Sequence, residues 1–179
     1  SLTRLAKKLC SSYVELMTNY LVMHNEIKQS EEGLSLIHGD LTLDNIHLSS
    51  QTKRITVIDW EMSGAGAKEE DLSSLVSSLI SLKVLQLSTP GLNPSKFADE
   101  LLKVHGRAVN FLDAYIEKVD ETINYKLLDC LFKEKIRCRT ILSLHMFGER
   151  SLQFRLLESV YKKLVVSGIV SVVDFSRKG

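Results

Sequence analysis

The chain has 179 residues, of which 44% are apolar and 25% charged, values typical of one globular domain with a sizeable core. Lys and Arg number 23 and Asp and Glu 22, so the net charge of +1 offers no basic surface for nucleic acid or an anionic membrane. No apolar run approaches the roughly 18 residues of a membrane span, and no signal-peptide pattern opens the sequence. We therefore expect a cytoplasmic domain without nucleic-acid or membrane partners.

The first half of the sequence changes its hydrophobic period twice. Residues 2–28 place apolar side chains on one helical face and predict a leading helix. After a polar break, 34–37 reads as a short buried strand, and 46–48 and 54–58 read as two strands of a β-hairpin. Gly64-Ala65-Gly66 lacks the third glycine and the strand-to-helix context of a dinucleotide-binding loop, so it is interpreted as a flexible turn.

The second half reads as helical throughout. Apolar residues recur at helical spacing in several stripes, which include Leu72, Leu75, Val76, Leu79 and Ile80, then Leu127, Leu128, Leu131, Phe132, Leu142 and His145. The predicted fold class is mainly α, in the α+β sense: a helical domain interrupted near its start by a small β-hairpin. Within one domain we expect a leading helix (1–33), a segment with the hairpin and polar loops (34–67) and a helical subdomain (68–179).

The three cysteines give no sign of a metal site or a disulfide framework. Cys10, Cys130 and Cys138 are odd in number and share no CxxC spacing, whereas a structural zinc site needs four ligands at short paired spacings. We expect reduced thiols packed as small hydrophobic side chains.

Polar side chains concentrate at the two ends of the predicted hairpin. Asp40 and Asn45 precede it, and Asp59 follows it. Because a hairpin returns the chain close to its start, these side chains should converge. Carboxylate and amide oxygens suit Mg²⁺, whose shell is completed by water and substrate phosphates. A metal site together with a second carboxylate, Asp40, that contacts an acceptor hydroxyl is the arrangement that phosphoryl transfer requires.

The segments HGDLTLDN (38–45) and IDWE (58–61) together resemble the aminoglycoside phosphotransferase and choline kinase family, a branch of the protein-kinase-like fold. Protein kinases have Arg where Gly39 stands and Phe-Gly after the metal-binding Asp. The resemblance runs from Leu34 to about Leu79. It implies the C-terminal lobe of a kinase-like fold, with ATP and Mg²⁺ as cofactors.

The resemblance also implies a role for each matching residue. Asp40 would be the catalytic base that orients the acceptor hydroxyl, while Asn45 and Asp59 would hold Mg²⁺. His38 would shape the catalytic loop. Asp71 resembles the aspartate that hydrogen-bonds this loop, although an acid near a helix N-terminus is equally explained as a cap. Glu61 would reach the metal through water or be a solvated surface side chain.

Two features depart from the family pattern. Thr42 stands two residues after Asp40, where relatives often carry a basic residue or His that can meet the transferring phosphate. In addition, no glycine-rich loop and no lysine-bearing strand is identified in the 37 residues before His38, so no nucleotide-clamping Lys is assigned. We expect the N-terminal nucleotide lobe to be absent from this chain, so that another lobe or a partner chain is needed.

The predicted function is ATP-dependent transfer of the γ-phosphate to a hydroxyl of a small molecule such as a sugar, an amino-alcohol or an aminoglycoside-like compound. From Ser95 onward there are 15 basic and 11 acidic residues, which argues mildly against a polycationic aminoglycoside. Two alternatives stay open: a non-catalytic binding or scaffold remnant of the fold, and an atypical protein kinase like that of the tRNA-modification KEOPS complex. A metal-dependent phosphoesterase would need additional His and Asp ligands for two metals, and the sequence shows no such cluster.

Overall fold

The computed structural model describes part of the chain, mainly residues 34–86 and 123–163. Beyond these ranges it describes only residues 18, 22, 25, 93, 97, 110, 113–115, 117 and 118. Within this part the protein is mostly helical with small antiparallel sheets, so the predicted fold class is confirmed. Most of the predicted leading helix lies outside the described residues, as does Cys10. None of the described helices is both long and apolar enough to cross a membrane.

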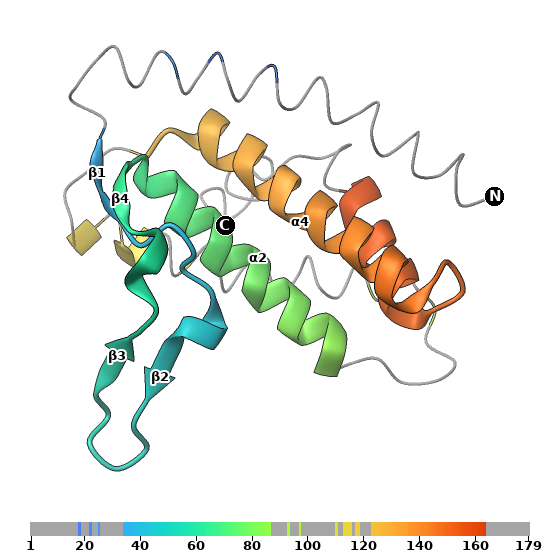
Figure 1. The fold of residues 1–179 in the computed structure, drawn as a ribbon, viewed down its shortest axis with the longest axis horizontal. Helices are drawn as coiled ribbons and strands as arrows, with labels where there is room; N and C mark the ends of the chain where they lie inside the picture. The colour runs from blue at the N-terminus through green and yellow to red at the C-terminus, as the bar shows by residue number, and fades with distance from the viewer. Residues whose placement is uncertain are drawn as a thin grey trace.

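The predicted hairpin is present and projects away from the helices (Figure 1). It consists of β2 (Ile46–Leu48) and β3 (Ile55–Val57), paired antiparallel so that Ile46 faces Val57 and Leu48 faces Ile55. Two short 3₁₀ helices flank it: η1 (Leu43–Asn45) leads into β2, and η2 (Trp60–Met62) follows β3. The hairpin therefore connects the two polar segments.

A second sheet corrects one prediction. β1 (Ser35–Ile37) pairs antiparallel with β4 (Gly64–Gly66), the segment interpreted from its glycines as a flexible turn. A Cβ on Gly66 would overlap the side chain of Ile37, so the glycine lets β1 and the buried Ile37 approach closely. Glycine is unfavourable in strands because it loses more backbone entropy on folding than other residues. Here the pairing with β1 and the close contact with Ile37 outweigh that cost.

Helices α2 (Lys68–Gln86) and α4 (Tyr125–Phe147) lie side by side and run in the same direction (Figure 1). Their N-terminal ends are joined by Glu69, whose Oε1 accepts a hydrogen bond of 2.7 Å from the backbone N–H of Asn124. Asn124 in turn caps α4, since its side chain accepts from the N–H of Leu127 at 3.1 Å. Gly148 ends this helix with φ at 80°.

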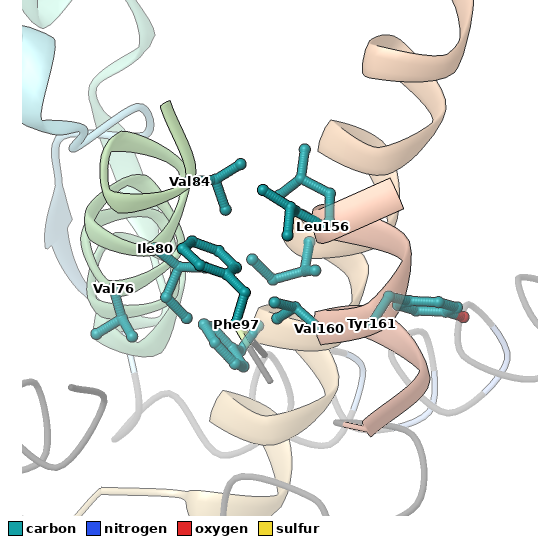
Figure 2. Packing of buried hydrophobic residues seen from close by; sticks show 10 residues of the cluster. Val76, Ile80, Val84, Phe97, Leu156, Val160 and Tyr161 are labelled. Atoms are coloured by element: carbon teal, nitrogen blue, oxygen red, sulfur yellow. The ribbon is translucent and has the colours of Figure 1, made fainter. Parts of the chain in front are cut away.

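The main core lies between α2, α4 and the helical residues 152–163 (Figure 2). It contains Val76, Ile80, Val84, Phe97, Phe132, Ile136, Leu156, Leu157, Val160 and Tyr161. The predicted stripes are buried over most of their length, but Leu79, Leu142 and His145 are exposed. These three residues lie where their helices face solvent.

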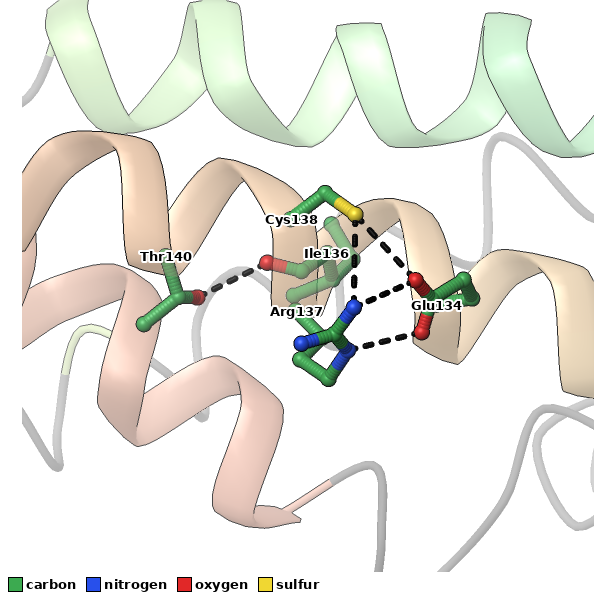
Figure 3. A network of polar contacts seen from close by, with 5 residues as sticks. All are labelled: Glu134, Ile136, Arg137, Cys138 and Thr140. Atoms are coloured by element: carbon green, nitrogen blue, oxygen red, sulfur yellow. Dashed lines mark hydrogen bonds and ion pairs between the residues drawn. The ribbon is translucent and has the colours of Figure 1, made fainter. Parts of the chain in front are cut away.

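Cys130 is buried as predicted, but Cys138 is exposed. Instead of packing as a hydrophobic side chain, the Cys138 thiol donates a hydrogen bond of 3.2 Å to Oε1 of Glu134 (Figure 3). The same carboxylate forms a two-pronged ion pair with Arg137, at 2.6 and 2.7 Å. The polar partner at helical spacing, four residues earlier, explains why Cys138 stays at the surface.

Candidate active site

The loop after β1 is anchored to the first turn of α2. The carboxylate of Asp71 accepts two hydrogen bonds, from the backbone N–H of His38 at 2.7 Å and from that of Gly39 at 3.0 Å. A carboxylate that accepts two backbone hydrogen bonds makes charge-assisted contacts, which are stronger than neutral ones. The side chain therefore fixes the start of the loop that carries Asp40.

His38 joins the two polar segments. Its imidazole is buried, with Nε2 at 2.8 Å from the carbonyl oxygen of Ile58 and Nδ1 at 3.3 Å from the backbone nitrogen of Asp40. The carbonyl can only accept and the backbone nitrogen can only donate, so the arrangement selects the neutral ring with its proton on Nε2. The ring also lies 4.8 Å from that of Trp60, centroid to centroid. His38 shapes both loops and leaves no ring nitrogen for acid–base chemistry.

Asn45 lies beside Asp40. Its Nδ2 donates a hydrogen bond of 2.9 Å to the carbonyl oxygen of Asp40 and lies 3.5 Å from the Oδ2 of the same residue. The backbone carbonyl of Asn45 accepts from the N–H of Ile58 at 3.0 Å. These contacts use the amide nitrogen of Asn45, so its side-chain oxygen can serve as a ligand.

Asp59 directly follows Ile58, whose carbonyl oxygen contacts His38 and whose N–H donates to the Asn45 carbonyl. These two contacts hold Asp59 next to the segment before the hairpin. Asp59 has a left-handed backbone (φ 65°, ψ 58°), a conformation that Asp tolerates better than most residues. Its exposed carboxylate makes no capping hydrogen bond to η2. The structure thus places Asp40, Asn45 and Asp59 at the base of the hairpin.

This residue set fits a magnesium ion that is shared with a phosphate ligand. Among the described residues, no group of three or more His, Cys, Asp or Glu side chains is placed to hold a metal by itself. Mg²⁺ does not require such a cage, because it commonly takes one or two protein ligands and completes its shell with water and phosphates. The Asn45 oxygen and the Asp59 carboxylate are oxygen donors of this type, so they are the residues that would hold the ion.

Glu61 is exposed on η2, and nothing in the described part of the chain ties its side chain to Asp40, Asn45 or Asp59. Thr42 precedes η1 and makes no side-chain capping hydrogen bond. The threonine side chain is uncharged, so this position supplies no cation to the site where relatives often carry a basic residue or His.

Sequence reasoning missed two residues that shape the site. Gly39 has φ at 84°, and a Cβ there would overlap the carbonyl oxygen of Met62, so only glycine lets the two loops come this close. Ser78 is buried on α2, and its Oγ accepts a hydrogen bond of 3.1 Å from the N–H of Leu43 in η1. The unusual serine content of α2, with SSLVSS at 73–78, was the available signal for the second contact.

Comparison with known proteins agrees with this geometry. Residues 18–86 match the model of a family described as the phosphotransferase enzyme family. The predicted resemblance to phosphotransferases is confirmed. The matched segment of this phosphotransferase-like chain contains His38, Asp40, Asn45, Asp59 and Asp71. No curated protein and no solved structure matches the chain. The family supports a kinase-like enzyme in general.

Proposed function

We propose that this chain carries the catalytic lobe of an ATP-dependent phosphotransferase that acts on a hydroxyl of a small molecule in the cytoplasm. The observation that supports it best is the pair of peptide contacts around Ile58, to His38 Nε2 and to the Asn45 carbonyl. These contacts hold Asp59 next to the loop that carries Asp40 and Asn45. Without them, the two carboxylates would belong to separate loops with no common ligand.

Each side chain then has one role. Asn45 and Asp59 would hold Mg²⁺, which when bound screens the negative charge of the ATP phosphates. The exposed carboxylate of Asp40 accepts a hydrogen bond from the acceptor hydroxyl and takes its proton as transfer proceeds. His38 and Asp71 hold the loop backbone, so that the Asp40 carboxylate keeps its place when the substrates bind.

We also propose that a second lobe or a partner chain covers this site. Large apolar side chains are exposed around it: Leu36 is 78% exposed on β1 and Met62 71% on η2, and Leu48, Ile55, Ile58 and Trp60 are exposed on the hairpin and η2. Exposed apolar patches of this kind mark interaction surfaces. A covering element would supply contacts to the nucleotide base and phosphates.

Metal binding at the site is tested with Mn²⁺ in place of Mg²⁺, in the presence of ATP. Paramagnetic broadening of amide NMR signals should centre on Asn45 and Asp59, and Asp59→Asn should abolish it. Asp40→Asn should retain it, because Asp40 is not placed as a ligand. Uniform broadening, or broadening that survives Asp59→Asn, would refute the metal site.

Transfer is tested with γ-labelled ATP and a panel of sugars, amino-alcohols, aminoglycosides and a protein substrate. The chain by itself should bind MgATP weakly and show negligible turnover, because phosphoryl transfer depends on positioning by both lobes. Micromolar affinity with steady turnover would contradict the need for a covering lobe. Transfer to the protein alone would favour the atypical protein kinase over the small-molecule enzyme.

A further inference from the structure

Two arginines on one turn of α4 differ in their pairing. Arg137 is buried and forms the two-pronged ion pair with Glu134 (Figure 3). Arg139 is half-buried, yet within the described part of the chain it makes no hydrogen bond or ion pair. A guanidinium carries five N–H donors, and leaving them unpaired while partly removed from water is unfavourable. Such a group is suited to receive an anion.

The packing of α4 against α2 determines which way Arg139 is directed. Leu72 packs with Leu128 at the start of the two helices, and farther along Ile80 and Ile136 belong to the same core cluster. Leu127 and Leu131, on a neighbouring stripe of α4, pack against Ala67, which joins β4 to α2. At helical spacing this stripe continues to residues 135 and 139. Arg139 therefore lies on the side of α4 that faces the sheets and loops.

The catalytic loop follows the same side of α2. Asp71 binds the beginning of the loop and Ser78 binds Leu43, two turns farther along the helix. Helical side chains lean toward the N-terminus, so the long side chain of Arg139 reaches back toward the level of Ser78. Asp44 is the residue after Leu43, which places an exposed carboxylate at the same level.

Electrostatics agree with this placement. Partial burial lowers the pKa of the Arg139 guanidinium, and the negative charges of Asp40 and Asp44 act in the opposite direction. The two carboxylates are exposed, so they attract the guanidinium without occupying its donors. Arg139 therefore remains cationic and available beside the catalytic loop.

We propose that Arg139 is a phosphate-binding residue of this site, which contacts an oxyanion held next to Asp40. The proposal rests on the proposed function for the identity of the reaction, and it supplies the cation that Thr42 cannot. A guanidinium binds phosphate oxygens through two parallel hydrogen bonds, which fix the geometry as well as the charge. The oxyanion is either the γ-phosphoryl group of the nucleotide or an anionic group on the acceptor.

The test is protection of Arg139 from phenylglyoxal, a reagent selective for arginine, measured by peptide mass mapping of the full chain. Inorganic phosphate at about ten times its Kd should slow modification of Arg139 about tenfold, because only the empty site reacts. Arg54, exposed on the hairpin turn, is the unprotected control, and the paired Arg137 should react slowly throughout. Equal rates at Arg139 with and without phosphate would overturn the proposal.

The nucleotides then identify the source of the oxyanion. Protection by MgATP beyond that by MgADP assigns the oxyanion to the γ-phosphoryl group. Protection by inorganic phosphate but by neither nucleotide assigns it to the acceptor, and equal protection by the two nucleotides would contradict both assignments. The phosphate experiment needs neither a metal nor turnover, so it can succeed in Asp59→Asn. Failure of the proposed phosphotransfer is in this way distinguishable from failure of the anion site.

Variants of Arg139 provide an independent measurement. Phosphate should shift the amide NMR signals of Leu41 and Thr42 in the unmodified chain, less in Arg139→Lys, and not in Arg139→Gln. Unchanged melting temperatures would show that all three proteins are folded. In an active assembly, Arg139→Gln should lower kcat by about 10²-fold, the usual loss for one oxyanion donor. Full phosphate-induced shifts in Arg139→Gln would refute the proposal.

Discussion

The Nε2 of His38 lies 2.8 Å from the carbonyl oxygen of Ile58, and this contact joins the loop of Asp40 to the residue before Asp59. Twenty residues separate the two partners, and the whole β-hairpin lies between them. A buried histidine thus closes the base of the hairpin.

Replacement of the ring nitrogens of His38 should destabilise the protein. His38→Phe keeps a ring beside Trp60 but removes the hydrogen-bond partners of the Ile58 carbonyl and the Asp40 N–H. Both contacts are partly buried, and the loss of two hydrogen bonds of this kind costs about 1–3 kcal/mol in total. Urea unfolding measures the free energy of unfolding. The control is His47→Phe, the same substitution at an exposed position on β2, which should stay within about 0.5 kcal/mol of the unmodified chain. Equal losses in the two variants would mean that His38 acts only as a packed ring.

Asp71→Asn should lower the stability of the fold, whereas Asp40→Asn should lower the transfer rate and leave stability nearly unchanged. The amide of Asp71→Asn cannot accept both backbone hydrogen bonds, and a hydrogen bond to a charged group contributes about 1.5–3 kcal/mol. Asp40 is exposed, so Asp40→Asn should leave the free energy of unfolding nearly unchanged. In an active assembly, Asp40→Asn should lower the transfer rate about 10²- to 10⁴-fold as a lost general base. Equal thermal shifts in the two variants, with activity kept in Asp40→Asn, would reverse these roles.

A series of glycine-to-alanine variants separates backbone strain from steric overlap. Gly64→Ala meets no atom and has no positive φ, so it should change stability little. Gly148→Ala meets no atom and adds only backbone strain, because φ 80° with ψ 168° is a region essentially confined to glycine; this costs about 1–3 kcal/mol. Gly39→Ala adds strain and an overlap with the Met62 carbonyl, so it should be the most destabilising. Denaturant midpoints give the order, and a Gly39→Ala loss equal to that of Gly148→Ala would show that the loops can move apart.

The described cysteines should make stability depend on pH at the alkaline side. Burial raises the pKa of Cys130, helped by the charges of Asp129 and Glu134; burial and the hydrogen bond to Glu134 raise the pKa of Cys138. Because the folded state holds the thiols neutral, their contribution is complete below the ordinary thiol value of 9.0 and is lost as pH rises above it.

The measurement is urea unfolding between neutral pH and pH values above 9.0, where unfolded thiols ionise. A double variant, Cys130→Ser with Cys138→Ser, removes this part of the dependence and is the control for other alkaline groups. Mass-mapped alkylation should likewise be slow at both thiols at neutral pH. Rapid alkylation of Cys138 at neutral pH would contradict its raised pKa.

The sequence by itself determined the local elements and the polar motifs. Alternating and helical hydrophobic periods predicted β1, the hairpin and the later helices, because these patterns reflect which face each element buries. The spacing of Asp40, Asn45 and Asp59 around a hairpin predicted their convergence, since a hairpin returns the chain to its start. These are properties of short segments, which sequence periodicity encodes directly.

Tertiary structure decided the contacts between segments that are far apart in the chain. Gly64–Gly66 becomes a strand only because β1 lies beside it and Ile37 needs the space at Gly66. Ser78 holds Leu43 across 35 residues, and Arg139 lies beside the catalytic loop only through the packing of α4 on α2. No local pattern specifies such pairings, because their free energy depends on burial and hydrogen bonds that form only when the helices and loops are assembled.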